Sequence, residues 1–288
     1  MEYRGHSNRS VVVYGARLCW QSFARQDDLG PNDRKLLSNL IKRGHYSPLN
    51  LLWYKFEKFS GDQYLTLIGR NQEFQSYMYY DPNKEILLIN ARTLKHGQDR
   101  QDEICLQLID QVIDDTPVIF GDTEANLAIR EESISPIDVV GYEYVELLDK
   151  FENLYFLEVK GISRALFHEW VRHRQMLCAK STRYTLKELA DVHHADIPAV
   201  AERFIVHTGD YYTDQHSCDA LWTLWENLNS EQNPNDIIKY NLPECYRTHL
   251  VTVIPDWSLD NMLKLREGNA ALWEWKNWVP RIREATGR

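Results

Sequence analysis

The stretch NLYFLEVKGISRALFHEWVRHRQMLCAKSTRYT, residues 153–185, decides how the fold of this chain is interpreted. Its first part, NLYFLEVKG, is apolar and favours a strand, whereas ISRALFHEWVRHR has the spacing of an amphipathic helix. Residues three or four apart on a helix are neighbours, so Arg164, His168 and Arg172 share one face. Glu169, Arg172 and His173 share another. We therefore expect a strand followed by a helix that ends in the triplet Arg-His-Arg.

Positive charge is concentrated in this stretch. Residues 164–187 contain six Lys or Arg against one Glu, a local charge of +5 in a chain of net charge −9. The triplet at 172–174 repels itself unless an anion compensates it, and the hydroxyls and guanidinium of residues 181–183 suit a phosphate. The alternative is a solvated basic face on which Arg172 pairs with Glu169, the usual arrangement on charged helices. The pattern favours a phosphate or pyrophosphate ligand.

The composition excludes several classes of protein. The chain has 288 residues, 43% of them hydrophobic and 26% charged, with nine Trp and sixteen Tyr, so it is globular rather than disordered. Its acidic charge argues against a broad nucleic-acid surface. Five scattered Cys have no metal-type spacing, and neither an 18-residue apolar run nor an apolar N-terminal signal is present. We expect a cytoplasmic protein without a membrane span or a metal.

The rest of the chain predicts a mixture of helices and strands that do not alternate strictly, which is an α+β class. We expect a short strand and a loop at VVVYGARLCWQS (11–22), and a helix over 32–43 with Asn32 or Asp33 as N-cap and Gly44 as its stop. EICLQLIDQVI (103–113) predicts an amphipathic helix, and residues 116–144 are polar and broken by proline. Helices are expected over 186–230, with breaks near Pro198 and Gly209, a strand at LVTVI (250–254), and helix from 258 to Pro280.

Several stretches together resemble the flavin-dependent thymidylate synthases (ThyX). The signature of that family is an Arg-His-Arg triplet, a spacer, then Ser and Arg-Tyr, as at residues 172–174, 181 and 183–184. Further matches follow in the same order: GARLCWQS, LIKRGHYSPLN, LPECYRTHLVTV, SLDNMLKLR and ALWEWK. The ordered set is more specific than any single motif. It implies a ThyX-like core of residues 1–60 and 156–288, with a central mixed or antiparallel sheet and flanking helices. Residues 61–155 would be an inserted subdomain, because a structureless loop of that length is improbable.

The resemblance also implies an activity and a set of site residues. Members transfer the methylene of methylenetetrahydrofolate to C5 of dUMP, use FAD that NADPH reduces, and form homotetramers with shared active sites. Carried over by position, the flavin would contact Arg172, His173, Arg174, Gln175, Asn261 and Ser47, with His45 beside the folate. The nucleotide would be held by Glu169, Ser181, Thr182, Arg183, Tyr184 and Lys239. Arg266 would face the uracil ring, and Arg266, Arg172 and His45 would be catalytic. A fixed guanidinium there would stabilise negative charge on the ring.

The chain departs from the family pattern mainly on the flavin side. The spacer QMLCAK has six residues where the family usually has seven, and Asn50-Leu51 replaces Glu-His after the Gly-His-x-Ser-Pro loop. Pro255-Asp256-Trp257 stands where polar flavin contacts are usual, and Ala270 replaces a His. The nucleotide side is better preserved. We therefore expect the flavin contacts to be the altered part of the site.

Each residue also has a purely structural interpretation. His45 after Gly44 would cap the preceding helix, Ser181 and Thr182 would form an N-cap, and Arg266 would be a surface cation. Cys178 is interpreted as a buried structural thiol. His193 and His194 are adjacent, so their side chains point apart, which favours a polar helix surface over a metal site.

Three functions are consistent with these residues. The first is flavin-dependent methylation of dUMP to dTMP. The second is a related flavoenzyme that hydroxymethylates a pyrimidine nucleotide or modifies another nucleotide, because a lost hydride delivery would let water trap the C5 adduct. The third is a non-catalytic nucleotide-binding protein that keeps the pocket for regulation or assembly.

Overall fold

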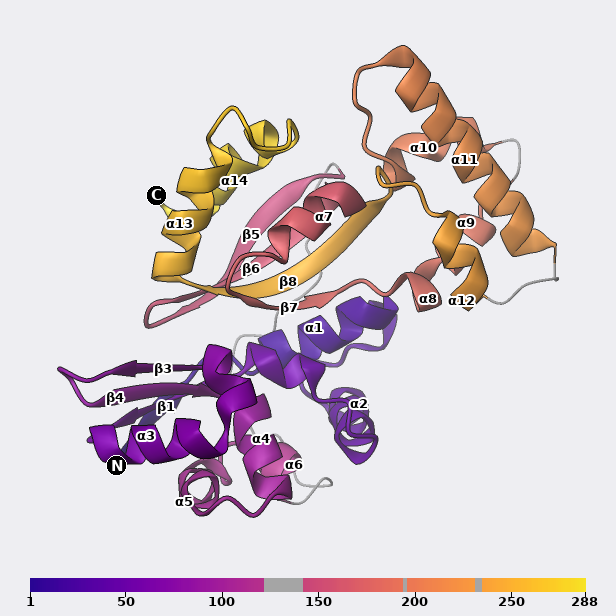
Figure 1. Cartoon of the computed structure of the whole chain (residues 1–288). Helices are drawn as coiled ribbons and strands as arrows, with labels where there is room; N and C mark the ends of the chain where they lie inside the picture. Colours follow the sequence, from indigo (N-terminus) through magenta and orange to yellow (C-terminus); the bar gives the residue numbers. More distant parts are fainter. Residues whose placement is uncertain (122–141, 194–195, 231–234) are drawn as a thin grey trace.

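Two antiparallel sheets organise the chain in this computed structural model, which describes residues 1–121, 142–193, 196–230 and 235–288 (Figure 1). The first has the order β1-β2-β4-β3, formed by β1 (Glu2–His6), β2 (Trp53–Glu57), β4 (Ile86–Asn90) and β3 (Met78–Asp81). The second has the order β5-β6-β8-β7, formed by β5 (Tyr144–Phe151), β6 (Leu154–Ser163), β8 (Arg247–Pro255) and β7 (Met176–Ala179). The α+β class is confirmed, with two four-stranded sheets in place of one central sheet.

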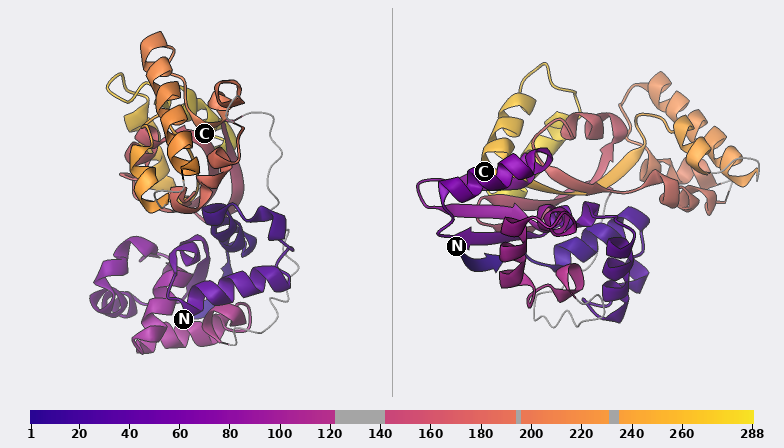
Figure 2. Two further views of the ribbon diagram at one scale, coloured as in Figure 1. Left: turned by 90° about the vertical axis from the view of Figure 1, so that its right-hand side faces the viewer. Right: turned by 60° about the horizontal axis from the view of Figure 1, so that its bottom comes forward.

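The helices fall into three groups. The first surrounds the N-terminal sheet: α1 (Ser10–Trp20), η1 (Phe23–Arg25), α2 (Pro31–Lys42), η2 (Ser47–Leu51), α3 (Gly61–Arg70), η3 (Gln72–Tyr77), α4 (Ala91–Asp99), α5 (Glu103–Val112) and α6 (Pro117–Phe120). The second packs on the second sheet: α7 (Arg164–Trp170), α13 (Asp256–Arg266) and α14 (Trp275–Thr286). The third extends beyond the end of that sheet: α8 (Thr182–Thr185), α9 (Lys187–Ala190), α10 (Ile197–Phe204), α11 (Tyr211–Asn229), α12 (Asn235–Ile238) and η5 (Lys239–Asn241). Figure 2 shows the first group on one side of the molecule and the other two on the opposite side.

The second sheet is buried on both faces, because successive side chains of a strand point to opposite sides. Leu157 and Leu250 belong to the core formed with α7, α13 and α14. Phe156 and Val251 belong to the core that contains α1 and the first sheet. The sheet therefore holds the end of α7 beside α13 on one face, and α1 beside β7 on the other (Figure 1).

The strand that we expected at residues 11–22 is wrong, because these residues form helix α1. All nine residues from Ser10 to Leu18 are buried, and α1 lies between the second sheet and the N-terminal elements. A continuous apolar run lacks the periodicity that distinguishes a buried helix from a buried strand.

The helix expected to end in the triplet Arg-His-Arg is too long, because α7 ends at Trp170 and the triplet follows it. Other helix predictions agree more closely with the structure. The expected helices at 32–43 and 103–113 are α2 and α5, although the N-cap of α2 is Gly30 and Pro31 occupies its first turn. The single stretch of helix expected from 258 to Pro280 is wrong, because α13 ends at Arg266 and α14 runs from Trp275 past Pro280 to Thr286. Burial of Trp278 and Ile282 outweighs the one backbone hydrogen bond that Pro280 cannot donate. Most of the polar stretch at 116–144 and His194 lie outside the described residues.

Residues 61–121 complete the first sheet rather than standing apart from it. Strand β4 pairs with β2, and β3 pairs with β4. Leu87 and Leu108 share a core with Val11. Whether 61–155 is an insertion relative to the family stays a prediction. The longest described helix, α11, has 19 residues, and no described helix is long and apolar enough to span a membrane.

Candidate active site

The end of α7 meets α13 and α14 in a cluster of four residues, Glu169, His173, Arg266 and Trp275, which we call the arginine cluster. Arg266 Nη1 donates to Glu169 Oε2 at 2.7 Å, and Arg266 Nη2 donates to the Glu169 carbonyl at 3.3 Å. Trp275 Nε1 donates to the same carboxylate at 2.9 Å, and the guanidinium lies 5.2 Å from the Trp275 ring centre. A guanidinium held over an indole and paired with a carboxylate has little freedom to move.

The sequence positions this cluster through caps and buried contacts. Ser163 caps α7, since its hydroxyl accepts from Leu166 N at 3.0 Å. The buried Glu274 accepts from Ser163 N at 3.0 Å and thereby ties the start of α7 to the segment before α14. The ring of Trp275 stacks on the ring of Trp170 at 5.4 Å. Residues from both ends of α7 therefore fix the orientation of the cluster.

His173 is neutral in this environment. Arg266 Nε donates to His173 Nε2 at 3.1 Å, and arginine has only donors, so this ring nitrogen carries no proton. Burial and the Arg266 charge lower the pKa of His173 to about 4, and Glu169 offsets only part of that shift. At neutral pH the cluster therefore holds one cation, one anion and a neutral imidazole.

A second group of residues lies where β7 leads into α8. Ser181 N donates to the Cys19 carbonyl at 3.2 Å, which ties this segment to the end of α1. Arg183 Nη2 lies 3.0 Å from Asp236 Oδ2, and Lys239 Nζ lies 3.4 Å from Asp236 Oδ1. Asp236 therefore holds two cations, from α8 and η5, on either side of one carboxylate. An incoming phosphate would find both charges already in place.

Comparisons with known proteins agree with this geometry in the part of the chain that carries it. A family model described as "Thymidylate synthase complementing protein" matches residues 151–287. The flavin-dependent thymidylate synthase of Helicobacter pylori strain J99 is 38% identical over 142 residues, which are 46% of this chain and 68% of that protein. The enzyme of the same name from Campylobacter jejuni strain RM1221 is 38% identical over 152 residues, 52% of this chain and 73% of that protein. The chain belongs to the flavin-dependent thymidylate synthase family.

A crystal structure of ThyX from Helicobacter pylori with FAD and dUMP is similar at 22% sequence identity and a TM-score of 0.42. It covers 99% of this chain and 91% of that one.

The residues expected for this family on the nucleotide side fall into the two groups described above. Glu169 and Arg266 lie in the arginine cluster, whereas Arg183 and Lys239 flank Asp236. Ser181 occupies the N-cap position of α8, but its side chain makes no capping hydrogen bond. Thr182 begins α8, and Tyr184 lies within it. The roles of these residues stay predictions.

Of the residues expected on the flavin side, some are exposed and one is hydrogen-bonded within the chain. Arg172, Arg174 and Asn261 are exposed, and Arg174 lies 5.9 Å from the ring centre of Trp257. Gln175 is engaged within the chain. Its Oε1 accepts from Trp170 Nε1 at 2.7 Å and from Thr252 Oγ1 at 2.6 Å, and its Nε2 donates to the Trp170 carbonyl. A flavin contact from the Gln175 amide would need one of these bonds to break.

His45 follows α2, and Ser47 begins η2. Gly44 has a φ of 68°, and His45 N donates to the Leu40 carbonyl at 2.9 Å, so the backbone ends α2 as the structural interpretation of His45 predicts. The side chain remains exposed, with Nε2 at 3.2 Å from Ser47 Oγ and its ring 5.8 Å from the Trp20 ring. Capping by the backbone therefore leaves the imidazole available to a ligand.

Two members of these groups were missed by sequence reasoning. Asp236 is placed between two cations by the fold, and no spacing rule connects it with Arg183, 53 positions earlier in the chain. Trp275 was given no role in the site from sequence, yet it donates to Glu169. Only the ALWEWK match pointed to that region. Among the described residues, no group of His, Cys, Asp and Glu could hold a metal ion.

Proposed function

We propose that this chain is a flavin-dependent thymidylate synthase that transfers a one-carbon unit from methylenetetrahydrofolate to C5 of dUMP, giving dTMP, with FAD reduced by NADPH. The observation that carries the proposal is the arginine cluster. Arg266 is held by Glu169 at 2.7 Å and still has N–H groups that can donate to a substrate. The names of relatives that are 38% identical support the same activity.

The residues of the flavin side fit an anionic cofactor. Arg172 and Arg174 follow α7, and neither has a carboxylate partner within the parts of the chain that the structure describes. Two such guanidiniums suit the pyrophosphate of FAD. Trp257 adds an exposed ring beside Arg174. When bound, the flavin supplies the hydride that completes the methyl group.

The nucleotide would be anchored by its phosphate and activated at its ring. Arg183 and Lys239 would exchange part of their contact with Asp236 for the phosphate, and Ser181 and Thr182 would donate hydroxyl hydrogen bonds. Three of the five N–H groups of Arg266 donate to His173 and Glu169, so two remain for the uracil oxygens. Negative charge that develops on the ring as C5 attacks would be stabilised by this preoriented cation.

We further propose that a complete site needs more than one subunit, in a homotetramer. The arginine cluster lies where α7 meets α13 and α14, on one face of the second sheet, whereas α8 and α12, which contain Arg183 and Asp236, lie beyond the end of that sheet (Figure 1). A site shared between copies would bring the arginine cluster of one subunit to the Asp236 group of another. Size determination of the protein with FAD and dUMP tests this, and a monomer that turns over would contradict it.

The product identifies the reaction. We would incubate the purified chain with dUMP, methylenetetrahydrofolate, FAD and NADPH and analyse the nucleotide by mass spectrometry. A methylated product supports the proposal. A hydroxymethylated product indicates the related flavoenzyme. An unchanged nucleotide that still raises the melting temperature indicates a binding protein. Protein that stays colourless after reconstitution with FAD would exclude flavin chemistry.

Two variants separate binding from turnover. Arg266→Ala should lower kcat by about 100-fold or more, because the cation acts on charge that develops in the reaction. Arg183→Ala should mainly raise the dissociation constant of dUMP, because it removes a phosphate contact present before and after the chemistry. Arg283→Ala, which removes an exposed pair with Glu267, is the matched control and should change neither quantity. Equal loss of affinity in the first two variants would contradict these roles.

A further inference from the structure

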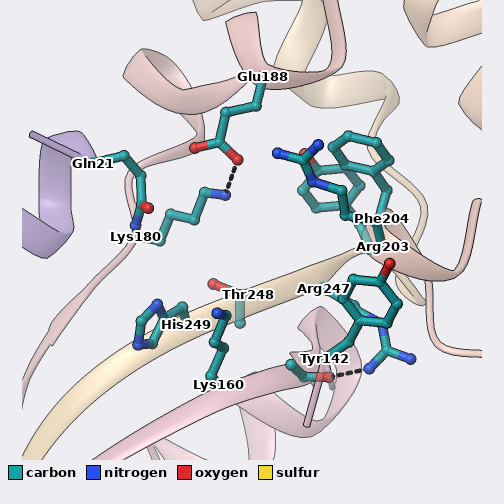
Figure 3. Close-up of a pocket in the computed structure, with 12 residues that line it drawn as sticks. Gln21, Tyr142, Lys160, Lys180, Glu188, Arg203, Phe204, Arg247, Thr248 and His249 are labelled. Carbon is teal, nitrogen blue, oxygen red and sulfur yellow. Dashed lines mark hydrogen bonds and ion pairs between the residues drawn. The ribbon is translucent and has the colours of Figure 1, made fainter. Parts of the chain in front are cut away.

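A cavity of about 810 Å³ opens at the end of the second sheet that lies away from the arginine cluster (Figure 3). Lys160, Gly161 and residues 246–249 form one side, Lys180 and Gln21 a second, and Glu188, Arg203 and Phe204 of α9 and α10 a third. Its volume is typical of small-molecule sites. None of the residues assigned to dUMP or to the flavin lines it.

Positive charge in this cavity exceeds what its own carboxylates compensate. Lys180 Nζ pairs with Glu188 Oε2 at 2.6 Å, and Arg247 Nη1 pairs with Glu143 Oε1 at 2.6 Å. Lys160 and Arg203 pair with no carboxylate within the described part of the chain. Lys160 Nζ lies 5.5 Å from the ring centre of Tyr144, and Arg203 Cζ lies 5.3 Å from that of Phe204. Lys160 is only partly exposed, so its charge gains little from solvent. Both charges border the same space (Figure 3).

The floor of the cavity presents a fixed polar group. His249 is 8% exposed, and its Nε2 lies 2.6 Å from Oε1 of Glu158, which is completely buried. Tyr14 donates its hydroxyl to the same oxygen at 2.6 Å. Burial lowers the pKa of His249 despite the Glu158 carboxylate. The neutral ring therefore donates from Nε2 to Glu158 and offers its other nitrogen as an acceptor, which suits a ligand hydroxyl.

An aromatic wall completes the cavity. Phe204 and Tyr246 stack with ring centres 6.4 Å apart, and the ring of Tyr142, which is 45% exposed, lies 6.0 Å from the Arg247 guanidinium. A side chain at Gly161 would place its Cβ 1.9 Å from the Tyr142 carbonyl, so glycine is needed for this close approach. Its φ of 93° also favours glycine. Exposed aromatic surface beside two cations favours a planar ring that carries a negatively charged group.

We propose that this cavity is a second ligand site, which binds a nucleoside monophosphate with its phosphate between Lys160 and Arg203, its sugar hydroxyl on His249 and its base against Tyr142. The site is distinct from that of the dUMP substrate, and the proposal does not depend on the proposed reaction. The two sites share one segment, because Lys180 directly precedes Ser181.

The test uses AMP, whose purine base differs from that of the proposed substrate. AMP would be titrated calorimetrically into the 288-residue chain loaded with one equivalent of dUMP, which occupies the substrate site. We expect one AMP per chain, and Lys160→Met should weaken AMP binding at least tenfold, because it removes a charged phosphate contact but keeps the apolar stem. Arg203→Met, at an exposed position, should act in the same direction. Lys264→Met on α13 is the matched control and should leave AMP binding unchanged.

Two results would overturn the proposal. They are absence of AMP binding at millimolar concentration, and unchanged AMP affinity in both Lys160→Met and Arg203→Met. Adenosine should bind at least tenfold more weakly than AMP, and equal affinity would contradict the phosphate contact. A failure of the proposed reaction would leave this test intact, because the test measures AMP binding and not turnover. A separate titration with dUMP should give the same affinity in Lys160→Met as in the wild type.

Discussion

Replacement of Asp33 by Asn should destabilise the protein through a buried ion pair at the start of the chain. Arg17 Nη2 lies 2.5 Å from Asp33 Oδ1, and the two side chains are 4% and 1% exposed. Asp33 Oδ2 also accepts from Leu29 N at 3.0 Å, and Arg17 Nη2 donates to the Arg25 carbonyl at 3.0 Å. Asp33→Asn keeps the shape, removes the charge and puts an NH₂ group where one carboxylate oxygen accepted. Arg17 then stays buried without its anion.

The expected loss of stability follows from leaving the Arg17 charge away from water without its carboxylate. Breaking a buried pair by neutralising one partner costs about 3–5 kcal/mol, against a total stability of about 5–15 kcal/mol for a typical domain. We expect urea unfolding, followed by tryptophan fluorescence, to show a loss of about 3 kcal/mol or more at neutral pH. Asp110→Asn, at an exposed position on α5, is the matched control and should change stability by less than about 0.5 kcal/mol.

A loss no larger than that of the control would refute the reasoning, since it would mean that the Arg17 charge finds water or another partner at little cost. The consequence also reaches the active site. Asp33 lies in α2, which ends at Lys42 and is followed by Gly44 and His45. If α2 is loosened, the protein should bind any ligand that contacts His45 more weakly. Titration of the variant with FAD measures this affinity.

Three further predictions concern other parts of the chain. The folded protein holds His173 neutral down to about pH 4, whereas the unfolded chain protonates it near pH 6.5, so stability falls as the pH drops between these values. His173→Gln should therefore lose less unfolding free energy between about pH 7 and about pH 5, and an unchanged pH profile would contradict the assignment. Gly161→Ala should destabilise by about 3 kcal/mol, because its Cβ would meet the Tyr142 carbonyl, and a melting temperature equal to that of wild type would exclude this contact. Burial raises the pKa of the Cys105 thiol, so it should react with thiol reagents only on unfolding, which mass spectrometry of labelled peptides would reveal.

Periodicity predicted those elements whose two faces differ in environment. The Leu37–Leu40–Ile41 spacing of α2 and the alternating burial around α5 are visible in the sequence because one side of each helix meets solvent. Helix α1 is buried all round, so its sequence contains no polar face that would reveal its period. The continuation of α14 past Pro280 depends on tertiary burial, which local propensity does not contain.

The site was predictable where its residues are close in sequence. The spacing of Glu169 and His173 predicted that they are neighbours, and they do lie in one cluster although α7 ends at Trp170; Arg266 was assigned through the family resemblance. The neutral state of His173 was not predictable, because it depends on Arg266, 93 positions later in the chain. The cavity near Lys160 combines residues from β6, β8 and α10 that no motif connects. Such sites are products of the topology and become visible only in the folded chain.

The position of α1 between two sheets has a consequence for biosynthesis. Val11 and Val13 share one core with Val253 of β8, which leaves the ribosome about 240 residues later. At a synthesis rate of about 5–20 residues per second, the apolar face of α1 stays uncovered for roughly 10–50 s, until the strand that covers it has been made. During that time the nascent chain displays a short β-branched segment of the kind that chaperones bind. Translation speed and chaperone supply should therefore influence the yield of folded protein more strongly than the stability of the finished fold would suggest.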